Sequence, residues 1–308
     1  MELHQLRYFL TALSEGSFSA AAARHRLTQQ AVSKSISRLE QELGTKLFLR
    51  DGHALKPTPA GQLLAGHAQV IDAESRQFQR HLGELLGSAP AELNIGAGPT
   101  AARHLVAATV ERLLDETPGI HVSVSGGTTH SMAPQLKRGE LDAFVSVLVQ
   151  RKPDPQLRCD VIYREPTLLV ARAGHPLVNR RRVSLAETLQ FPWLGGAGMD
   201  HWGDLVRSSF VAAGLKPPQP HVKTDSLPFA YGLLAATDYL AVMPAALVQF
   251  DMDAGRLASI NAPVDWSRPV ALFYRDNPAQ SAAVSAFIAT LHSVAKRPGA
   301  VCRSRSVR

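Results

Sequence analysis

The chain has 308 residues, of which 45% are apolar and 19% are charged, a composition typical of a folded globular protein. It has no apolar run near the roughly 18 residues of a membrane-spanning helix and no signal-peptide pattern at its N-terminus, so we expect a cytoplasmic protein without membrane partners. The formal net charge is +7, but five uncompensated basic residues lie in the tail 296–308, which we expect to be disordered (Lys296, Arg297, Arg303, Arg305 and Arg308). Charge alone therefore gives little support for nucleic-acid binding.

The two cysteines, Cys159 and Cys302, are too few for a disulfide framework and lack metal-ligand spacing. We expect one to be buried in a strand and the other to be a free thiol in the tail, with a redox switch between them as the alternative. The sequence contains no phosphate-binding loop, dinucleotide fingerprint, HExxH motif or nucleophile elbow. We therefore predict no enzymatic activity, no catalytic or metal-binding residues and no cofactor.

The N-terminal segment begins with two predicted helices. Apolar residues at helical spacing predict a first helix that Gly16 ends (Leu3, Leu6, Phe9, Leu10 and Leu13). Ser19 is expected to cap a very short second helix from Ala20 to Ala23, whose small side chains allow close packing.

Thr28 is a good N-cap for a third helix with two segregated faces. Val32, Ile36, Leu39 and Leu43 form its apolar face, and Gln29, Gln30, Ser33, Lys34, Ser37 and Arg38 form the opposite face. Glutamine can bond bidentately to adenine, lysine and arginine to guanine or phosphate, and serine to phosphate, so this face suits the major groove. An ordinary solvated helix face is the alternative, but the short helix, turn and capped helix together favour a helix-turn-helix.

A hairpin and a long helix are predicted to follow. Residues 47–58 read as two strands around Asp51-Gly52, a candidate wing whose Arg50, His53 and Lys56 could reach DNA. From Pro59 to Leu86 a heptad pattern predicts a dimerisation helix, with packing on its own domain as the alternative (Leu64, Ala68, Ile71, Phe78, Leu82 and Leu85). The segment 87–90 marks a domain boundary.

Beyond Pro90, strands and helices alternate, which predicts two α/β lobes with a mostly parallel sheet around a cleft. The predicted strands are 93–97, 121–124, 141–147, 167–171 and 192–194, and the predicted helices are 101–114, 132–138 and 201–213. The segments 239–243 and 268–274 continue the pattern as a second subdomain that returns to the first. Ligands of such folds bind beyond the carboxyl ends of strands, where helix N-termini favour anions. The candidate ligand-binding residues are Pro99, Thr100, Ala101, Thr128, Thr129, Ser146, Gly196, Met199, His201 and Ser226. Thr100, Thr129 and Ser226 could instead be simple helix caps.

Residues 1–65 resemble the DNA-binding domain of LysR-type transcriptional regulators. The matching segments are Leu6 to Phe9, Gly16 to Ala22, Leu27 to Ser33, Ile36 to Gly44, Leu47-Phe48 and Thr58 to Gly61. Family members usually have proline where this chain has Gln30, and often arginine where it has His53. The resemblance implies that Ser19, Thr28, Gln29, Gln30, Ser33, Lys34, Ser37, Arg38, Arg50 and His53 contact DNA.

The rest of the chain resembles the effector-binding domain of the same family, itself similar to periplasmic binding proteins. The segments Leu136 to Asp142, Gly174 to Leu177 and Leu240 to Pro244 carry this looser resemblance, whereas the family usually has glycine around Thr237-Asp238. The expected fold is an all-α winged helix-turn-helix domain (1–58), a linker helix (59–88) and a two-lobed α/β effector domain (89–295). Its subdomains are about 89–164 plus 268–295, and 165–267.

The resemblance implies a regulator that binds a near-palindromic promoter site as a dimer or tetramer. A small organic effector, which we expect to be an anion, would bind between the lobes, and activation is the more usual outcome in the family. RNA polymerase is a further candidate partner. The alternatives are a cytoplasmic solute-binding protein and an enzyme whose N-terminal helices serve only dimerisation.

Overall fold

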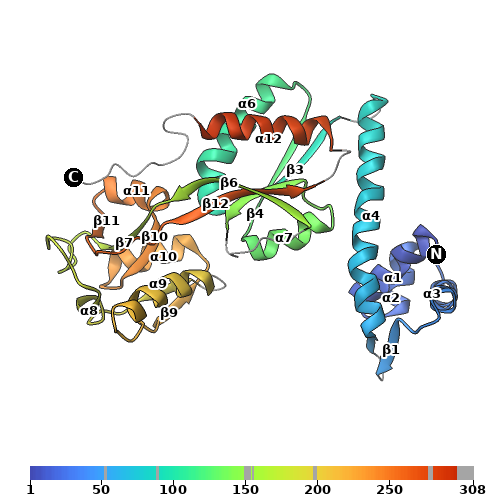
Figure 1. The fold of residues 1–308 in the computed structure, drawn as a ribbon, viewed down its shortest axis with the longest axis horizontal. Helices are drawn as coiled ribbons and strands as arrows, with labels where there is room; N and C mark the ends of the chain where they lie inside the picture. The colour runs from blue at the N-terminus through green and yellow to red at the C-terminus, as the bar shows by residue number, and fades with distance from the viewer. Residues whose placement is uncertain are drawn as a thin grey trace.

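The structure is a computed structural model that describes residues 1–51, 54–87, 90–148, 154, 156–196, 200–276 and 280–296. A small helical unit, a long helix and a two-lobed unit follow one another along the chain (Figure 1). No helix in these ranges is both long and apolar enough to cross a membrane.

The first two helices are α1 (Leu3–Glu15), which ends at Gly16 with φ 64°, and α2 (Phe18–His25). The prediction that Ser19 caps α2 is wrong, because the extended residue Ser17 is the N-cap and its hydroxyl accepts from the Ala20 N–H. Ser19 is the second residue of the helix and is exposed. Helix α2 is therefore longer at both ends than the predicted 20–23.

Helix α3 (Gln29–Leu43) begins at its predicted cap, Thr28, whose hydroxyl accepts from the Ala31 N–H at 3.2 Å. Val32, Ile36 and Leu39 are buried against α1 and α2, as the apolar stripe predicts. Leu43 is 43% exposed, because the helix runs past the small core before Gly44 ends it.

The hairpin consists of β1 (Phe48–Asp51) and β2 (Ala54–Pro57), which pair in antiparallel register. Thr58 then caps α4 (Pro59–Leu85) by accepting from the Gly61 N–H at 3.0 Å. A Cβ atom at Gly61 would lie 2.2 Å from the Leu47 carbonyl oxygen, so only glycine allows α4 to start against the hairpin.

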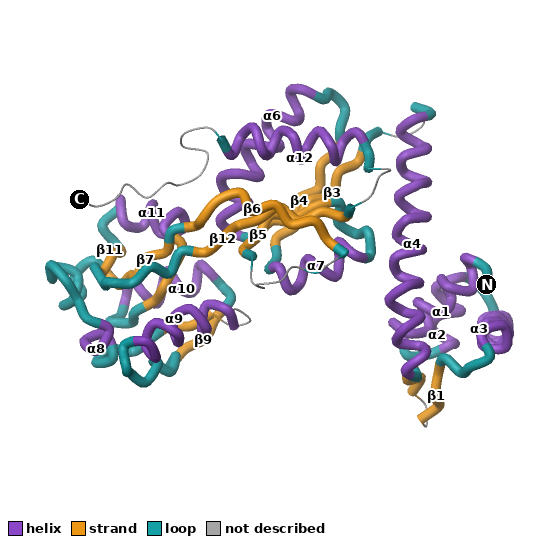
Figure 2. Tube along the Cα trace, viewed as in Figure 1, coloured by secondary structure: helices purple, strands orange, loops and turns teal. Residues whose placement is uncertain are grey.

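The first lobe is built on a five-stranded sheet of order β4-β3-β5-β12-β6. Its strands are β3 (Glu92–Ala97), β4 (His121–Gly126), β5 (Ala143–Val147), β6 (Leu157–Glu165) and β12 (Arg268–Arg275). A continuous helical segment made of α5 (Pro99–Ala101), a π-helix (Ala102–Val106) and α6 (Ala107–Glu116) lies with α12 (Ala282–Ala295) on one face. Helix α7 (Thr129–Lys137) lies on the other face (Figure 2).

The second lobe has a three-stranded sheet of order β10-β7-β11 and a separate pair, β8 and β9. These strands are β7 (Thr167–Arg172), β8 (Leu194–Gly196), β9 (Val222–Thr224), β10 (Ala241–Pro244) and β11 (Leu257–Ile260). The helices are α8 (Leu185–Thr188), α9 (Asp200–Ala212), α10 (Leu227–Ala236) and α11 (Ala245–Asp253).

The expectation of a mostly parallel sheet is wrong. In the described residues, β3 pairs in parallel with β4 and β5, β8 pairs in parallel with β9, and a single parallel bridge joins Trp193 to Leu240. By contrast, β12 runs antiparallel to β5 and β6, and β7 runs antiparallel to β10 and β11. The physical reason is the chain path, because β6 leads out of the first lobe and β12 returns to it, so the two connecting strands run in opposite directions.

Candidate DNA-contact face and ligand cleft

The polar face of α3 is turned to solvent. Gln29, Gln30, Lys34, Ser37 and Arg38 are exposed, and Ser33 is half-buried. Thr28 is also exposed, although its hydroxyl is already used as the helix cap. Long amide and cationic side chains on an exposed face remain free to reach base edges and phosphates.

Two contacts hold the ends of this face. The Ser19 hydroxyl donates to Gln29 Oε1 at 2.9 Å, which ties α2 to the start of α3. Near the other end, Arg38 pairs with Glu42 at 3.4 Å, and Glu42 also binds the N-terminal ammonium at 2.6 Å. The hydrogen bond from that ammonium lowers the pKa of Glu42, so this carboxylate partly offsets the positive charge of Arg38.

The hairpin beside α3 is described only in part. Arg50 lies in β1, but its side chain falls outside the described atoms, as does the whole of His53. Lys56 is exposed on β2. The wing contacts predicted for Arg50 and His53 therefore stay predictions.

The burial of the apolar side chains of α4 changes along the helix. Near its start, Ala65 and Ala68 are buried in the helical core. Beyond them, apolar side chains of α4 are exposed to solvent, among them Phe78, which is 65% exposed (Val70, Ile71, Phe78 and Leu82). Leu63, near the start of the helix, is exposed as well. Packing on its own domain, the alternative from the sequence, therefore holds for the start of α4. Dimerisation through this helix stays a prediction.

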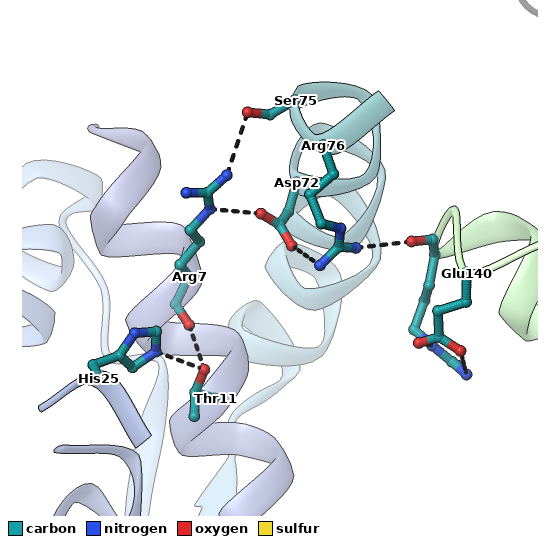
Figure 3. Close-up of polar contacts among 8 residues, drawn as sticks. Arg7, Thr11, His25, Asp72, Ser75, Arg76 and Glu140 are labelled. Carbon is teal, nitrogen blue, oxygen red and sulfur yellow. Dashed lines mark hydrogen bonds and ion pairs between the residues drawn. The ribbon is translucent and has the colours of Figure 1, made fainter. Parts of the chain in front are cut away.

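One side of α4 contacts the first lobe. Arg76 Nη2 donates to the Arg138 carbonyl at 2.9 Å (Figure 3). Arg80 Nη2 donates to Asp142 Oδ1 at 3.2 Å, and Arg275 Nη2 donates to Gln77 Oε1 at 2.6 Å. Because these contacts surround the α7–β5 turn, the helix that carries the DNA-contact unit also touches the ligand-binding unit.

A cleft lies between the lobes at the carboxyl ends of β3 and β5 and encloses about 100 Å³. Its walls are mostly apolar, and hydroxyl groups from the first lobe face it. The lining residues are Gly98, Pro99, Thr100, Ala101, Gly127, Thr128, Thr129, Ser146, Val147, Glu165, Leu227, Val242, Met243, Pro244, Leu247, Arg268 and Val270. This volume is small beside the roughly 300 Å³ or more of drug-sized ligand pockets, so the space suits a small molecule.

Six of the ten predicted ligand-binding residues come together in this cleft (Pro99, Thr100, Ala101, Thr128, Thr129 and Ser146). Of the others, Gly196 ends β8 and Ser226 caps α10, and neither lines the cleft. Met199 and the His201 side chain fall outside the described part of the chain.

The hydroxyl groups have defined partners. Thr128 and Ser131 form a reciprocal cap at the start of α7, and the Thr129 hydroxyl donates to the Val147 carbonyl at 2.6 Å. Thr129 can therefore only accept a further hydrogen bond from a ligand. No group of three or more metal-ligating side chains occurs within the described ranges.

Sequence reasoning missed a buried ion pair in the cleft, formed by Glu165 at the end of β6 and Arg268 at the start of β12. They are 1% and 5% exposed. Burial lowers the pKa of Arg268, while the adjacent Glu165 acts in the opposite direction. The two residues are 103 positions apart in sequence, and only the register of β6 on β12 brings them together.

Comparison with known proteins identifies both units. Residues 87–296 match the LysR substrate binding domain, and residues 3–62 match the bacterial regulatory helix-turn-helix protein of the lysR family. The chain belongs to the LysR family of transcriptional regulators. Its relatives in the family include the SDS degradation transcriptional activation protein of a Pseudomonas species, 30% identical over 259 residues that make up 83% of each chain.

Other members of the LysR family span nearly the whole chain. PcaQ of Agrobacterium fabrum is 25% identical over 296 residues, 96% of this chain and 95% of PcaQ. Among solved structures, CbnR has a TM-score of 0.66 at 20% identity, covering 96% of this chain and 100% of its own. ArgP of Mycobacterium tuberculosis has a TM-score of 0.68 at 23% identity, covering 95% and 96%. These likenesses show that the order of units described above is the fold of LysR-family regulators.

Proposed function

We propose that this LysR-family regulator binds a near-palindromic promoter site as a dimer or tetramer, with α3 in the major groove and the β1–β2 hairpin on the flanking backbone. The exposed polar face of α3 carries this proposal, because six hydrogen-bonding side chains project from a helix whose other face is buried. CbnR, which shares the fold, has been solved in complex with its target DNA, with a TM-score of 0.64. That complex supports DNA binding by this chain, and the docking of α3 follows the usual geometry of helix-turn-helix proteins.

The uncovered stripe of α4 supports the dimer. A row of exposed apolar side chains along one helix is costly in water and is covered when a second α4 packs against it. Two copies related by a twofold axis would present two α3 helices to two half-sites, which accounts for a near-palindromic target.

The cleft supports a small organic acid as effector. Ser146 offers a hydroxyl group that can donate to a carboxylate, beside the first turn of α7, where backbone N–H groups have no partners within the helix. The apolar lining would cover the carbon skeleton of the ligand. Effector binding would then shift the relative position of the lobes and, through α4, the spacing of the DNA-contact units.

Activation of transcription, without enzymatic turnover, is the outcome that we propose. The Pseudomonas relative is by name a transcriptional activation protein, and GbpR and PcaQ are named as transcriptional regulators. Because its target is chromosomal DNA, we place the protein in the cytoplasm and infer contact with RNA polymerase at the promoter.

Footprinting tests the DNA-binding part of the proposal. The full chain, with and without candidate acids, is incubated with the promoter region beside its own gene over a range of salt concentrations. We expect a protected site whose affinity falls as salt rises, because each phosphate contact releases counterions. The absence of any protected site at low salt would contradict the proposal.

Calorimetry with a panel of small carboxylic acids tests the effector part. Ser146→Ala should weaken the binding of the best acid by about tenfold, because a hydrogen bond to a charged group contributes about 1.5–3 kcal/mol. Ser208→Ala, on the exposed face of α9, is the matched control and should leave the affinity unchanged.

A further inference from the structure

We propose that Glu165 selects the effector through a hydrogen-bond donor, so that the effector is a small carboxylic acid with a hydroxyl or amino group at the end away from its carboxylate. The inference rests on the proposed effector site and deepens it. It concerns the ion pair of the cleft, which neither the sequence motifs nor the family match assigns to a ligand.

The two oxygen atoms of Glu165 have different surroundings. Oε2 accepts a hydrogen bond from Arg268 Nη2, whereas Oε1 is buried and accepts no hydrogen bond among the described residues. A buried charged oxygen without a donor costs more than a neutral one, and native structures rarely leave it so. A donor from a ligand in the cleft would satisfy Oε1.

No described residue donates a hydrogen bond to Oε1. Apart from Arg268, whose Nη2 donates to Oε2, the residues that line the cleft from the second lobe and from β12 are apolar (Leu227, Val242, Met243, Pro244, Leu247 and Val270). The cleft hydroxyls lie on the first lobe, on α5, on β5 and at the start of α7 (Thr100, Ser146, Thr128 and Thr129). The cleft is therefore divided into a hydroxyl side, an apolar middle and an acceptor at Glu165.

The charges of the cleft fix the orientation of an acid. Arg268 neutralises Glu165, so the ion pair does not repel an anion from the cleft as a whole. A carboxylate placed directly against Oε1 would nevertheless meet a like charge and offer no proton. The carboxylate must therefore lie on the side of Ser146 and α7, and the donor must point to Glu165.

The sheet register sets the separation of the two ends. Ser146 pairs with Ala271 on one side of β12, and Glu165 pairs with Arg268 on the other side. Their strands are thus two strand spacings apart, about 10 Å of sheet. A donor on the carbon next to the carboxylate would fall short, so the two groups of the effector must lie several bonds apart.

Glu165 lies where the chain passes from one lobe to the other. Glu165 is the last residue of β6 before the chain enters the second lobe, and Arg268 is the first residue of β12 on its return. A ligand that binds Glu165 therefore contacts the two strands that connect the lobes.

Matched acids test the inference on the full-length wild-type protein by calorimetry. The probes are benzoate with 3-hydroxybenzoate, 4-hydroxybenzoate and 3-aminobenzoate, and butyrate with 2-hydroxybutyrate and 4-hydroxybutyrate. At least one acid with a distal donor should bind about tenfold or more tightly than its parent, because the parent leaves a charged acceptor unsatisfied. In the butyrate series, 2-hydroxybutyrate should show no such gain.

The double variant Glu165→Met/Arg268→Met assigns the preference to this pair. Replacing both partners of a buried ion pair by apolar residues of similar size commonly preserves folding, unlike removal of one partner. We expect the advantage of the distal donor to be lost or reversed, with the parent acid still bound. Glu140→Gln, which removes a carboxylate paired with Arg138 outside the cleft, should keep the wild-type preference.

The outcomes separate the two levels of the proposal. If parent and donor-bearing acids bind the wild type equally, the role of Glu165 is wrong and the acid effector stands. If the preference survives in the double variant, another residue provides it and the assignment to Glu165 is overturned. If no acid of the panel binds the wild type, the acid effector itself is wrong, and the inference falls with it.

Discussion

Asp72 lies between Arg7 and Arg76, and its carboxylate pairs with Arg7 Nε and with Arg76 Nη1 at 2.7 Å each (Figure 3). Arg7 belongs to α1, Asp72 and Arg76 belong to α4, and Arg76 continues to the Arg138 carbonyl of the first lobe. A single buried carboxylate thus joins the DNA-contact unit to the chain of contacts that reaches the effector lobe.

Asp72→Asn should lower the free energy of unfolding by about 1–3 kcal/mol, because the amide leaves two arginines without their counter-charge. Urea denaturation followed by circular dichroism measures the change. Glu116→Gln removes the partner of Arg112 in an exposed ion pair and should cost less than about 0.5 kcal/mol. Equal losses in the two variants would show that Asp72 has no special role.

Gln29→Ala and Ser33→Ala should each weaken operator binding by about tenfold or more, since a good base contact contributes about 1–3 kcal/mol. Gel-shift titration measures the affinity, and light scattering should show an unchanged oligomer because neither side chain belongs to the buried stripe of α3. Gln249→Ala, an exposed glutamine of α11, serves as the control. Wild-type footprints in both α3 variants would refute the assignment of the recognition helix.

Phe78→Asp should shift the dimer toward monomer, because it places a charge in the apolar stripe of α4 that a second copy would cover. Sedimentation velocity measures the dissociation constant, which we expect to rise at least about tenfold. Phe250 on α11 is a close match, at 63% exposure against 65% for Phe78, so Phe250→Asp should leave the oligomer intact. A dimer unaffected by Phe78→Asp would place the interface elsewhere.

His175 predicts a pH dependence of stability. It is 2% exposed, its Nδ1 accepts from the Leu177 N–H at 3.1 Å, and burial lowers its pKa below 6.5. Below about pH 6.5 the unfolded chain binds a proton that the folded chain does not, so the unfolding free energy falls as the pH drops, by at most about 1.4 kcal/mol per pH unit. Above that pH this residue has no effect.

Denaturation midpoints of the wild type and His175→Asn between pH 5.5 and pH 8 measure this contribution. The asparagine can still accept from the Leu177 N–H but does not titrate, so the acid side of its profile should be flatter than that of the wild type. His67→Asn, at an exposed position on α4, should keep the wild-type profile. Parallel profiles for wild type and His175→Asn would contradict the prediction.

Local signals predicted the N-terminal unit well. Thr28 caps the start of α3 and Gly16 ends α1, and both effects depend only on residues a few positions away in the sequence. Val32, Ile36 and Leu39 lie on one face of a single helix. The misplaced cap at Ser19 shows the limit of such signals, because Ser17 and Ser19 are chemically equivalent and only the extended backbone of residue 17 decides between them.

Long-range pairing could not be predicted in the same way. The candidates around Thr100, Thr128 and Ser146 follow strands, so a rule about strand ends was enough to bring them together. Glu165 and Arg268 meet only because β6 and β12 pair in one register, and no local pattern encodes that register. The apolar residues of α4 were visible in the sequence as a heptad pattern. Which of them are buried in the helical core and which are exposed depends on how the N-terminal helices pack against the start of α4.

Gly139 lies in the α7–β5 turn with φ 65°, and a Cβ atom there would meet the Ala73 Cβ of α4 at 2.9 Å. The lobe and the helix therefore meet at a point where two of the smallest residues touch without space for another methyl group. A larger side chain at residue 139 would push α4 away from the first lobe and alter the angle between them, even with the cleft and the α3 face unchanged. A substitution at this one position would thus change the coupling that we propose between the ligand cleft and the DNA-contact unit, while leaving the ligand-lining and α3 residues themselves intact.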